Sequence, residues 1–586
     1  MENNEHKLPS NGTGNDGQAG YTKQARHTRQ TGYTRQAGHT GHTEHTGQAA
    51  SIRYPDARSD PDRRSPAPSE ALKAAEYPLR PTVKQMNVRS LWKRLFTHRT
   101  LPVLALLFLL AIRLPHIGDS PFGYDSWRQS DTEAMARNFV EHRFNVLYPQ
   151  LNYQGPMPNY AQLELQITTF LIAILYKLFG YSYIAARFVP VAFFIGSAWF
   201  VYRIAARRYS AAAALFALLM YGLLPLNLLY SRAIMPESAA LFFYTGAFYW
   251  FSEWIAKEKR SLLLAAALFT SLAICEKIPT VFVGVPMLVM VIAKYRGGVF
   301  KRLELWGFAL LSLLPPYVYY AWLGTLAEST FVSGIASKHI VPRFATAAWS
   351  AEARQFFATE MPKAFTWTGL VVAAAGLILL LVRRRDFPLL VWTLAIAAEL
   401  ATIVAVIRFP YYMIFAGPLI ALLSAGVLEL WTKLGGEPNL RRRGSNGRGF
   451  SNRSRLAAGL CAVAVLAVIS AESYRQVVPV IGIQNEELIR QAEVVERLTV
   501  PDDLIVTGTD DPSLLNASRR TGWRVTNSIP GDPVAELDYF VREGAAYFVP
   551  LKGYIDGDPD GLLRRTLEER YPKLEAGSEY YIYKLR

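Results

Sequence analysis

The sequence predicts a polytopic α-helical membrane protein that ends in a small α/β domain. Of the 586 residues, 51% are hydrophobic and only 19% are charged, which is more apolar than an ordinary soluble protein. Apolar runs such as LPVLALLFLLAI and GLVVAAAGLILLLV recur between residues 100 and 475, as expected of a chain that crosses a membrane many times. After residue 474 the composition changes to that of a soluble domain.

The net charge of +16 is concentrated in two segments. Residues 1–99 and 433–455 together contribute +13 of it. Because cytoplasmic loops of membrane proteins carry an excess of Lys and Arg, this distribution indicates membrane orientation. It does not favour nucleic-acid binding, which needs the basic side chains on a folded domain. Only two cysteines, Cys275 and Cys461, occur, and both lie in apolar stretches, so we expect neither a disulfide framework nor a cysteine-based zinc site.

Residues 1–88 are rich in Gly, Thr, Gln, His and Pro. A segment of this composition cannot bury a core, and we expect a disordered cytoplasmic tail. Five of the nine histidines lie in it, which leaves metal binding by the tail as an alternative. We expect no cleavable signal peptide, because the first long apolar run begins only near residue 100.

The basic segments also orient the predicted spans. If the segment before residue 100 lies in the cytoplasm, the chain reaches the outer face near Leu114. The segment ITTFLIAILYKLFG at 167–180 is apolar enough to cross, but crossing would place the basic run RIAARR at 203–208 outside. We therefore expect 167–180 to lie as an interfacial helix at the outer surface, within a first external loop at 115–186.

This threading divides the chain into three parts. After the tail, residues 89–473 form the transmembrane domain, with about eleven transmembrane helices. Residues 474–586 form a small extracytoplasmic α/β domain, with a strand at DLIVTG, a helix at GLLRRTLEERY and a final strand at EYYIYKL. We expect this domain to be a structural or acceptor-presenting cap, since TGTDD lacks the glycine spacing and the lysine of a phosphate-binding loop.

Most charges that suggest chemistry fall on the predicted outer face. A charged side chain in or against the bilayer costs a few kcal/mol, so such residues are candidates for function. Carboxylates come from the first loop, and cations come from the outer ends of later helices. A phosphate on a lipid tail would lie at this depth, where arginine and lysine side chains bind it well.

The first loop resembles that of a known family. The run WRQSDTEAMARNF, followed by NVLYPQ, YQGPMPNYAQLEL and LYKLFG, is similar to the first loop of the GT-C membrane glycosyltransferases, in the branch of protein O-mannosyltransferases and the lipid A aminoarabinose transferase. SRAIMPESAALFF, SLAICEKIPTVFVGVPML and RFPYYMIFAGPLIALLSA resemble later outer-face segments in the same order. The resemblance covers roughly residues 95–425 and implies the GT-C fold. Many members carry Asp-Glu where this chain has Arg128-Gln129, with the acid displaced to Asp131.

The resemblance implies an inverting transfer of a sugar from a polyprenyl-phosphate sugar to a hydroxyl. The acceptor would be a cell-envelope lipid, glycan or protein. Because phosphate is a good leaving group, one carboxylate base and several cations form a sufficient catalytic set. Glycoside hydrolysis differs, since there a second carboxyl group must protonate a poor leaving oxygen. No cofactor is required, although Glu164 together with Asp131 could hold a divalent metal.

On this interpretation Asp131 is the first candidate for the base and Asp125 the second; the alternative for Asp131 is a helix-capping role. The candidate phosphate-binding cations are Lys277, Arg408, Arg232, Arg128 and Arg137. The candidate substrate-binding residues are Glu164, Glu237, His339, Arg343, Tyr411 and Tyr412. Loop salt bridges would equally explain the two first-loop arginines, interfacial snorkelling the cations at helix ends, and the aromatic belt the tyrosines.

Two other classes of function stay open. A transporter or flippase of lipid-linked saccharides would place ionisable residues at mid-membrane on broken helices in paired repeats. Here the charges gather at outer helix ends, and no inverted repeat is visible. A membrane-anchored binding or assembly protein would instead use the C-terminal domain. We therefore expect an enzyme in the cell membrane, with a cytoplasmic N-terminus, an extracytoplasmic C-terminal domain and no nucleic-acid partner.

Overall fold

The computed structural model describes residues 100–327, 331–383, 386–434, 448–525, 532–575 and 577–586. The tail predicted for 1–88 lies outside these ranges, as do residues 435–447 of the second basic segment.

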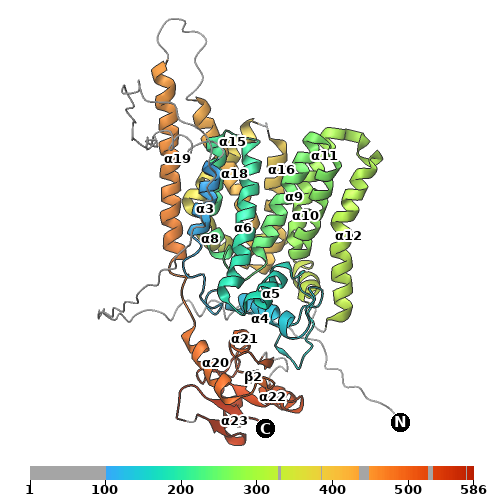
Figure 1. The fold of residues 1–586 in the computed structure, drawn as a ribbon, viewed down its shortest axis with the longest axis vertical. Helices are drawn as coiled ribbons and strands as arrows, with labels where there is room; N and C mark the ends of the chain where they lie inside the picture. The colour runs from blue at the N-terminus through green and yellow to red at the C-terminus, as the bar shows by residue number, and fades with distance from the viewer. Residues whose placement is uncertain (1–99, 328–330, 384–385, 435–447, 526–531, 576) are drawn as a thin grey trace, which may run out of the picture. The chain divides into compact units, whose positions relative to one another are not determined.

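The described chain begins with a bundle of apolar helices (Figure 1). Its longer helices are α3 (Leu101–Ala111), α6 (Tyr183–Ala206), α7 (Ala211–Leu223), α9 (Glu237–Lys257), α10 (Arg260–Glu276), α11 (Gly284–Tyr295), α12 (Leu303–Leu326), α15 (Trp367–Arg383), α16 (Phe387–Glu399), α18 (Gly417–Leu434) and α19 (Arg448–Val477). Shorter elements between them are α8 (Pro225–Tyr230), η2 (Ile278–Val283), η3 (Arg296–Lys301), α13 (Phe331–Ile335), η4 (Ala336–Ile340), η5 (Ala347–Trp349), α14 (Ala351–Phe365), η6 (Leu400–Val404), α17 (Ala405–Ile407) and η7 (Pro410–Ala416).

Aromatic side chains fill the core of the bundle. Trp392 of α16 packs against Phe248 of α9 with ring centroids 4.1 Å apart, and Tyr244 and Phe415 pack beside them. By length and composition, five helices in the described ranges could cross a membrane, or six if the pair α14 and α15, bent by 97°, forms one span. The fold is therefore that of a polytopic helical protein, while the count of about eleven spans stays a prediction.

The apolar segment 167–180 forms a short helix, α5 (Ile167–Phe179), which packs against α4 (Ser126–Glu141). At 1.5 Å per residue, its 13 residues reach about 20 Å of a hydrocarbon core of about 30 Å, the same reach as the 13-residue α7 of the bundle. Both helices lie across the lower end of the bundle in Figure 1. Phe139 of α4 and Tyr176 of α5 are buried between the two helices and α6. The place of α5 at the end of the bundle is compatible with an interfacial helix, which stays a prediction.

Several basic loops meet at the opposite end of the bundle. Arg208, after α6, pairs with Asp386, before α16, at 2.8 Å. Lys294 of α11 pairs with Glu258, after α9, at 2.6 Å. Lys433 near the end of α18 pairs with Glu429 on the same helix. We call this end, marked by these three pairs, the basic end.

The C-terminal region forms a six-stranded mixed sheet with helices around it. The strands are β1 (Gln154–Gly155), β2 (Leu504–Thr507), β3 (Thr521–Arg524), β4 (Tyr547–Val549), β5 (Lys573–Leu574) and β6 (Ile582–Lys584), in the spatial order β1-β3-β2-β4-β6-β5. The helices are α20 (Glu486–Leu498), α21 (Ser513–Ala517), α22 (Pro533–Arg542) and α23 (Leu562–Arg570). The central strand β2 is parallel to both β3 and β4, and the outer pairings are antiparallel.

The first strand of this sheet comes from the loop between α4 and α5. Gly155 pairs with Gly522 of β3, and a side chain at Gly522 would place its Cβ 1.9 Å from the Ile505 carbonyl oxygen. A single hydrophobic core also joins the two regions, since Met135 of α4 packs in the same cluster as Leu488 of α20 and Leu514 of α21. The loop that follows α3 and the C-terminal sheet are thus one packed unit, and this unit holds α4 in place.

Candidate active site

One candidate base immediately precedes helix α4, and the other lies within it. Asp125 precedes the helix in a left-handed conformation (φ 47°), and its carboxylate accepts a hydrogen bond of 2.5 Å from the Tyr230 hydroxyl. Burial raises the pKa of Asp125 above its ordinary value, although the Tyr230 hydrogen bond opposes this. Asp125 thus has its carboxylate occupied by a neighbouring side chain at the boundary between the loop and the bundle.

Asp131 lies two turns further along α4 and is almost fully enclosed. Its side chain is 6% exposed, and its Oδ1 atom has no hydrogen-bond partner among the described residues. Burial raises the pKa of Asp131 to about 7. Arg128 and Arg524 work against this rise, whereas Asp511 and Glu164 add to it, and the Tyr153 phenol faces the same group. A carboxylate with an unoccupied oxygen and a pKa near neutrality has the properties of a general base.

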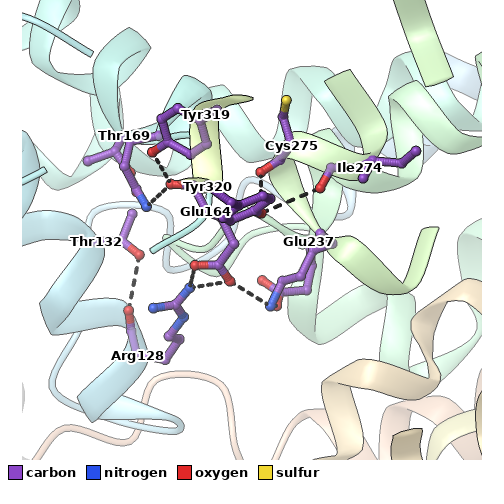
Figure 2. Close-up of polar contacts among 11 residues, drawn as sticks. Arg128, Thr132, Glu164, Thr169, Glu237, Ile274, Cys275, Tyr319 and Tyr320 are labelled. Carbon is purple, nitrogen blue, oxygen red and sulfur yellow. Dashed lines mark hydrogen bonds and ion pairs between the residues drawn. The ribbon is translucent and has the colours of Figure 1, made fainter. Parts of the chain in front are cut away.

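Four charged side chains meet beside α4, and we call them the ionic cluster. Nη2 of Arg128 lies 2.7 Å from both carboxylate oxygens of Glu164 (Figure 2). Nζ of Lys277 lies 3.3 Å from Oε1 of Glu164 and 2.8 Å from Oε1 of Glu237. All four side chains are largely or wholly removed from solvent. Two cations and two carboxylates therefore balance one another in a poorly hydrated site.

Helix ends explain why the cluster forms there. Glu237 begins α9, where the helix dipole favours a carboxylate, and Lys277 follows the last residue of α10, where it favours a cation. Glu164 belongs to the loop before α5, and its carbonyl oxygen accepts a hydrogen bond from Tyr319 of α12 at 3.1 Å (Figure 2). Burial acts to raise the pKa of Glu164, but Arg128 and Lys277 outweigh it and hold the value at about 2. Glu164 is therefore a permanent anion.

Two tyrosines of η7 complete the wall around Lys277. Its Nζ atom lies 5.2 Å from the ring centroid of Tyr411 and 4.7 Å from that of Tyr412. Contacts of this length between an ammonium group and an aromatic face are attractive. The structure thus brings six sequence-predicted residues together: Arg128, Glu164, Glu237, Lys277, Tyr411 and Tyr412. Of these, Arg128 and Glu164 act electrostatically on Asp131, and Glu237 acts on Asp125.

The other predicted residues lie elsewhere. Arg137 is paired with Glu133 one turn away at 2.8 Å, and this pair belongs to the packing of α4 on α5. Arg232 is buried beside Arg187, which donates to its carbonyl oxygen at 2.9 Å. Arg408 donates to the carbonyl oxygen of Ala405 at 3.4 Å. His339 and Arg343 are exposed, within η4 and shortly after it.

Two residues of the C-terminal domain, Arg524 and Asp511, also act electrostatically on Asp131, and the sequence did not predict this. The Arg524 guanidinium lies 4.5 Å from the ring centroids of both Trp127 and Tyr153 and forms an ion pair of 2.8 Å with Asp510. Asp511 accepts a hydrogen bond of 2.8 Å from the Ser126 hydroxyl of α4. The only sequence signal was the strand-like run GWRVTN, which contains Arg524 but does not name its neighbours.

The carboxylates of the site do not form a metal-binding set. Among the described residues, no three or more His, Cys, Asp or Glu side chains are grouped so that they could hold a metal ion. Glu164, one of the two residues that could have held a metal, is occupied by Arg128 and Lys277. The arrangement instead suits an anionic ligand close to two cations and a base.

Comparison with known proteins found one matching family model and several similar solved structures. A sequence model of the family described as dolichyl-phosphate-mannose-protein mannosyltransferase matches residues 167–322, a range that contains Glu237 and Lys277. The structure is similar to that of ArnT from Cupriavidus metallidurans bound to undecaprenyl phosphate, with a TM-score of 0.59 and 12% sequence identity. That match covers 83% of this chain and 98% of ArnT. The chain has the GT-C fold.

A second solved structure supports the same GT-C fold. The oligosaccharyltransferase of Archaeoglobus fulgidus in its apo form matches with a TM-score of 0.52 and 13% identity, over 78% of this chain and 70% of the other. A sequence search of curated proteins found no match. The resemblance of the chain to the GT-C membrane glycosyltransferases is therefore confirmed. The family model covers SRAIMPESAALFF and SLAICEKIPTVFVGVPML but not the first-loop run WRQSDTEAMARNF.

Proposed function

We propose that this GT-C protein transfers a sugar from a polyprenyl-phosphate sugar to a hydroxyl of a cell-envelope lipid, glycan or protein on the outer face of the membrane. The observation that carries the proposal is the position of Asp131 on α4. Its unoccupied Oδ1 atom lies on the same helix as Arg128, which joins Lys277 in the ionic cluster. A base and a phosphate site are thus held by adjacent parts of one packed unit. The similar ArnT structure contains undecaprenyl phosphate, which supports a polyprenyl-phosphate ligand.

The proposed reaction uses these groups in a single displacement. Asp131 accepts the proton of the acceptor hydroxyl while that oxygen attacks the anomeric carbon from the face opposite the phosphate. The bond between the anomeric carbon and the phosphate oxygen breaks, and its electron pair leaves with the polyprenyl phosphate. Attack from the opposite face inverts the anomeric configuration. The phosphate needs no proton donor, since cations stabilise it as it leaves.

The ionic cluster is suited to the charge that develops on the leaving group. The donor is a phosphodiester with one negative charge, and the released phosphomonoester carries about −1.5 to −2. Arg128 and Lys277 therefore attract the departing group more strongly than the bound donor, which is the requirement for a rate effect. Glu164 and Glu237 hold the two cations in place. The donor phosphate would share these cations with the carboxylates.

The proposal includes a membrane orientation. The basic end would face the cytoplasm, because cytoplasmic loops are enriched in Lys and Arg. The ionic cluster, α4 and the C-terminal sheet would then lie on the outer face. The N-terminus would be cytoplasmic, in a multi-pass protein of the cell membrane. Charged pairs that join the basic loops to one another, such as Arg208 with Asp386, support a common side for these loops.

The test is donor use by the full chain reconstituted in nanodiscs. Polyprenyl-phosphate sugars should be consumed, and soluble nucleotide sugars should not. Lys277→Gln combined with Glu237→Gln removes one cation and one carboxylate, so the cluster keeps its charge balance and avoids an unpaired buried charge. This double variant should raise the donor KM by about 10- to 100-fold, since a hydrogen bond to a charged group contributes about 1.5–3 kcal/mol.

Three outcomes would contradict the proposal. One is direct use of a nucleotide sugar by the wild-type chain. Another is an unchanged donor KM in the correctly folded double variant. The third is movement of a lipid-linked saccharide across proteoliposomes without transfer to any acceptor, which would identify a flippase.

A further inference from the structure

A cavity of about 380 Å³ lies where α4, the loop that follows it and the C-terminal domain meet, and we call it the loop–domain cavity. It is lined by the second half of α4, by loop residues 152–157 and by two segments of the C-terminal domain, 501–504 and 516–521. Its volume is in the lower part of the range of small-ligand sites, which is about 300–1,000 Å³. None of the six sequence-predicted residues that the site brings together lines it, whereas Arg137, another sequence-predicted cation, does.

Buried amides give the loop–domain cavity a defined hydrogen-bonding character. Asn516 of α21 is 3% exposed, and its Nδ2 atom has no partner among the described residues. Asn138 and Asn152 donate through Nδ2 to the carbonyl oxygens of Gln150 and Arg520. No described residue donates to the Oδ1 atom of either amide. The walls of the cavity therefore carry amide oxygens that can accept hydrogen bonds. Asn516 Nδ2, which its neighbours cover, is a buried donor without a partner, and such a donor costs about 1–3 kcal/mol.

This mixture suits a ligand with several hydroxyl groups, because each hydroxyl both donates and accepts. Arg519 adds a donor at the rim, and Met157 adds an apolar surface. The guanidinium group of Arg520 already donates to Thr499 and to the carbonyl oxygen of Ser518. A peptide is less suited to the cavity. Peptides commonly bind by adding a strand to a free sheet edge, and here the outer edge of β3 is already paired with β1.

The loop–domain cavity also lies next to Asp131. Ala134 and Asn138, which line it, follow Asp131 by three and seven residues on α4 and therefore share its face of the helix. Three residues of helix correspond to about 4.5 Å along the axis. The near end of the cavity is thus one helical turn beyond the carboxylate.

We propose that the loop–domain cavity binds the sugar rings of a saccharide acceptor and presents one of their hydroxyl groups to Asp131. The inference rests on the proposed function and narrows it, because it selects a glycan over a protein as the acceptor. It also gives the C-terminal domain a role in acceptor binding, since α21 and the segment before β3 supply Asn516, Arg519 and Arg520.

The test measures binding and acceptor use by the full chain in nanodiscs. The probes are delipidated oligosaccharides released from the envelope of the source cells by mild acid, and a Ser/Thr-rich synthetic peptide. The oligosaccharides should bind, and Asn516→Leu, which keeps a similar side-chain size, should weaken their binding and raise the acceptor KM about tenfold. Hydrolysis of the donor in the absence of acceptor should not change, because the variant is remote from the ionic cluster.

A pair of exposed arginines provides a control that does not depend on a buried site. Arg519 lines the loop–domain cavity and pairs with Glu496, and Arg497 does not line it and pairs with Glu575. Their side chains are 61% and 60% exposed. Arg519→Gln should raise the acceptor KM severalfold, and Arg497→Gln should leave it unchanged.

The outcomes separate this inference from the proposed function. If transfer from the polyprenyl-phosphate sugar occurs but Asn516→Leu and Arg519→Gln keep the wild-type acceptor KM, the cavity is not the acceptor site. Binding of the peptide in place of the oligosaccharides, or binding of neither probe, would also overturn the inference. If the oligosaccharides bind and both variants weaken that binding, but no sugar is transferred, the cavity assignment stands and the proposed function fails.

Discussion

The two ends of the helix bundle hold the same kinds of charged residue but differ in how much of each ion pair is buried. At the basic end, Lys433 is 64% exposed beside Glu429, and the buried Glu253, 2% exposed, pairs with the more exposed Arg207 and Lys257. At the other end, Lys277 is 3% exposed and Glu237 is 1% exposed. Exposed ion pairs contribute about 0–1 kcal/mol to stability, whereas burying a pair carries a large desolvation cost that pairing repays only in good geometry. The buried charges therefore need an explanation other than stability, and the exposed ones do not.

The difference in burial also changes what each charge can do to a ligand. Water and salt screen the exposed lysines, so they act mainly on membrane orientation. In the ionic cluster the effective dielectric constant is lower and each charge acts more strongly on a neighbour. Burial in this environment raises the pKa of Asp131. A bound phosphate would be attracted more strongly by Arg128 and Lys277 here than by exposed cations. Variants near the ionic cluster should consequently change sugar transfer, whereas variants at the basic end should change only stability.

The largest effect is expected from Asp131→Asn. The amide keeps the size of the side chain but cannot accept the proton of the acceptor hydroxyl. Transfer should fall by about 10²-fold or more, the usual contribution of a general base. Initial rates with a polyprenyl-phosphate sugar measure this, and donor binding should be retained because the ionic cluster is intact.

Two controls accompany this variant. Asp125→Asn should keep more activity, and the two roles are exchanged if it abolishes transfer while Asp131→Asn stays near wild type.

The second control is the pH dependence of stability. The pKa of Asp131 is raised on folding, so the wild type loses stability as the pH rises from about 4 through 7. Asp131→Asn should therefore have a higher Tm at pH 8 and a nearly unchanged Tm at pH 4. A lower Tm at pH 8 would instead indicate misfolding.

The helix bundle could be predicted from the sequence because hydropathy is a local property. The arginines at 203–208 favour an interfacial helix at 167–180, and this placement stays a prediction for the 13-residue α5. Glu237 and Lys277 could also be predicted as functional candidates, since each stands at the end of an apolar run where the bilayer makes a charge costly.

Which of those charges pair with one another could not be predicted from the sequence. Lys277 contacts carboxylates from two distant segments, and only the packing of α9 and α10 against the first loop decides which ones. Arg137 looked equivalent to Arg128 in the sequence, yet it pairs with Glu133 and lines the loop–domain cavity instead of joining the ionic cluster. The two-residue β1 is too short to give a periodic signal, so the sheet that brings Arg524 to Trp127 and Tyr153 could not be foreseen.

A smaller effect, distinguished by its pH dependence, is expected from Arg524→Gln. The positive charge of Arg524 lowers the pKa of Asp131, so its removal raises that pKa further above 7. Asp131 must be deprotonated to act as the base, and the acid limb of the pH–rate profile should move to higher pH. A change of about 1 kcal/mol corresponds to about a fivefold loss of transfer at pH 6, with a rate close to wild type at pH 9.

The matched control is Arg524→Lys, which keeps the charge but loses the planar group between the two rings. It should leave the acid limb near its wild-type position. If both variants lower the rate equally at every pH, Arg524 has only a packing role and does not tune the base.

The smallest effect is expected at the basic end, from Lys433→Ala. This change breaks the pair with Glu429, which joins residues four apart on α18 at 3.0 Å. Because the lysine is mostly in solvent, the loss should be about 0.3–0.5 kcal/mol of stability, and transfer rates and donor KM should stay at the wild-type values. Thermal unfolding and initial rates at two salt concentrations measure both. A loss of transfer comparable to that of the Lys277 double variant would show that charges at the basic end also act on the donor, and the functional contrast between the two ends would then be wrong.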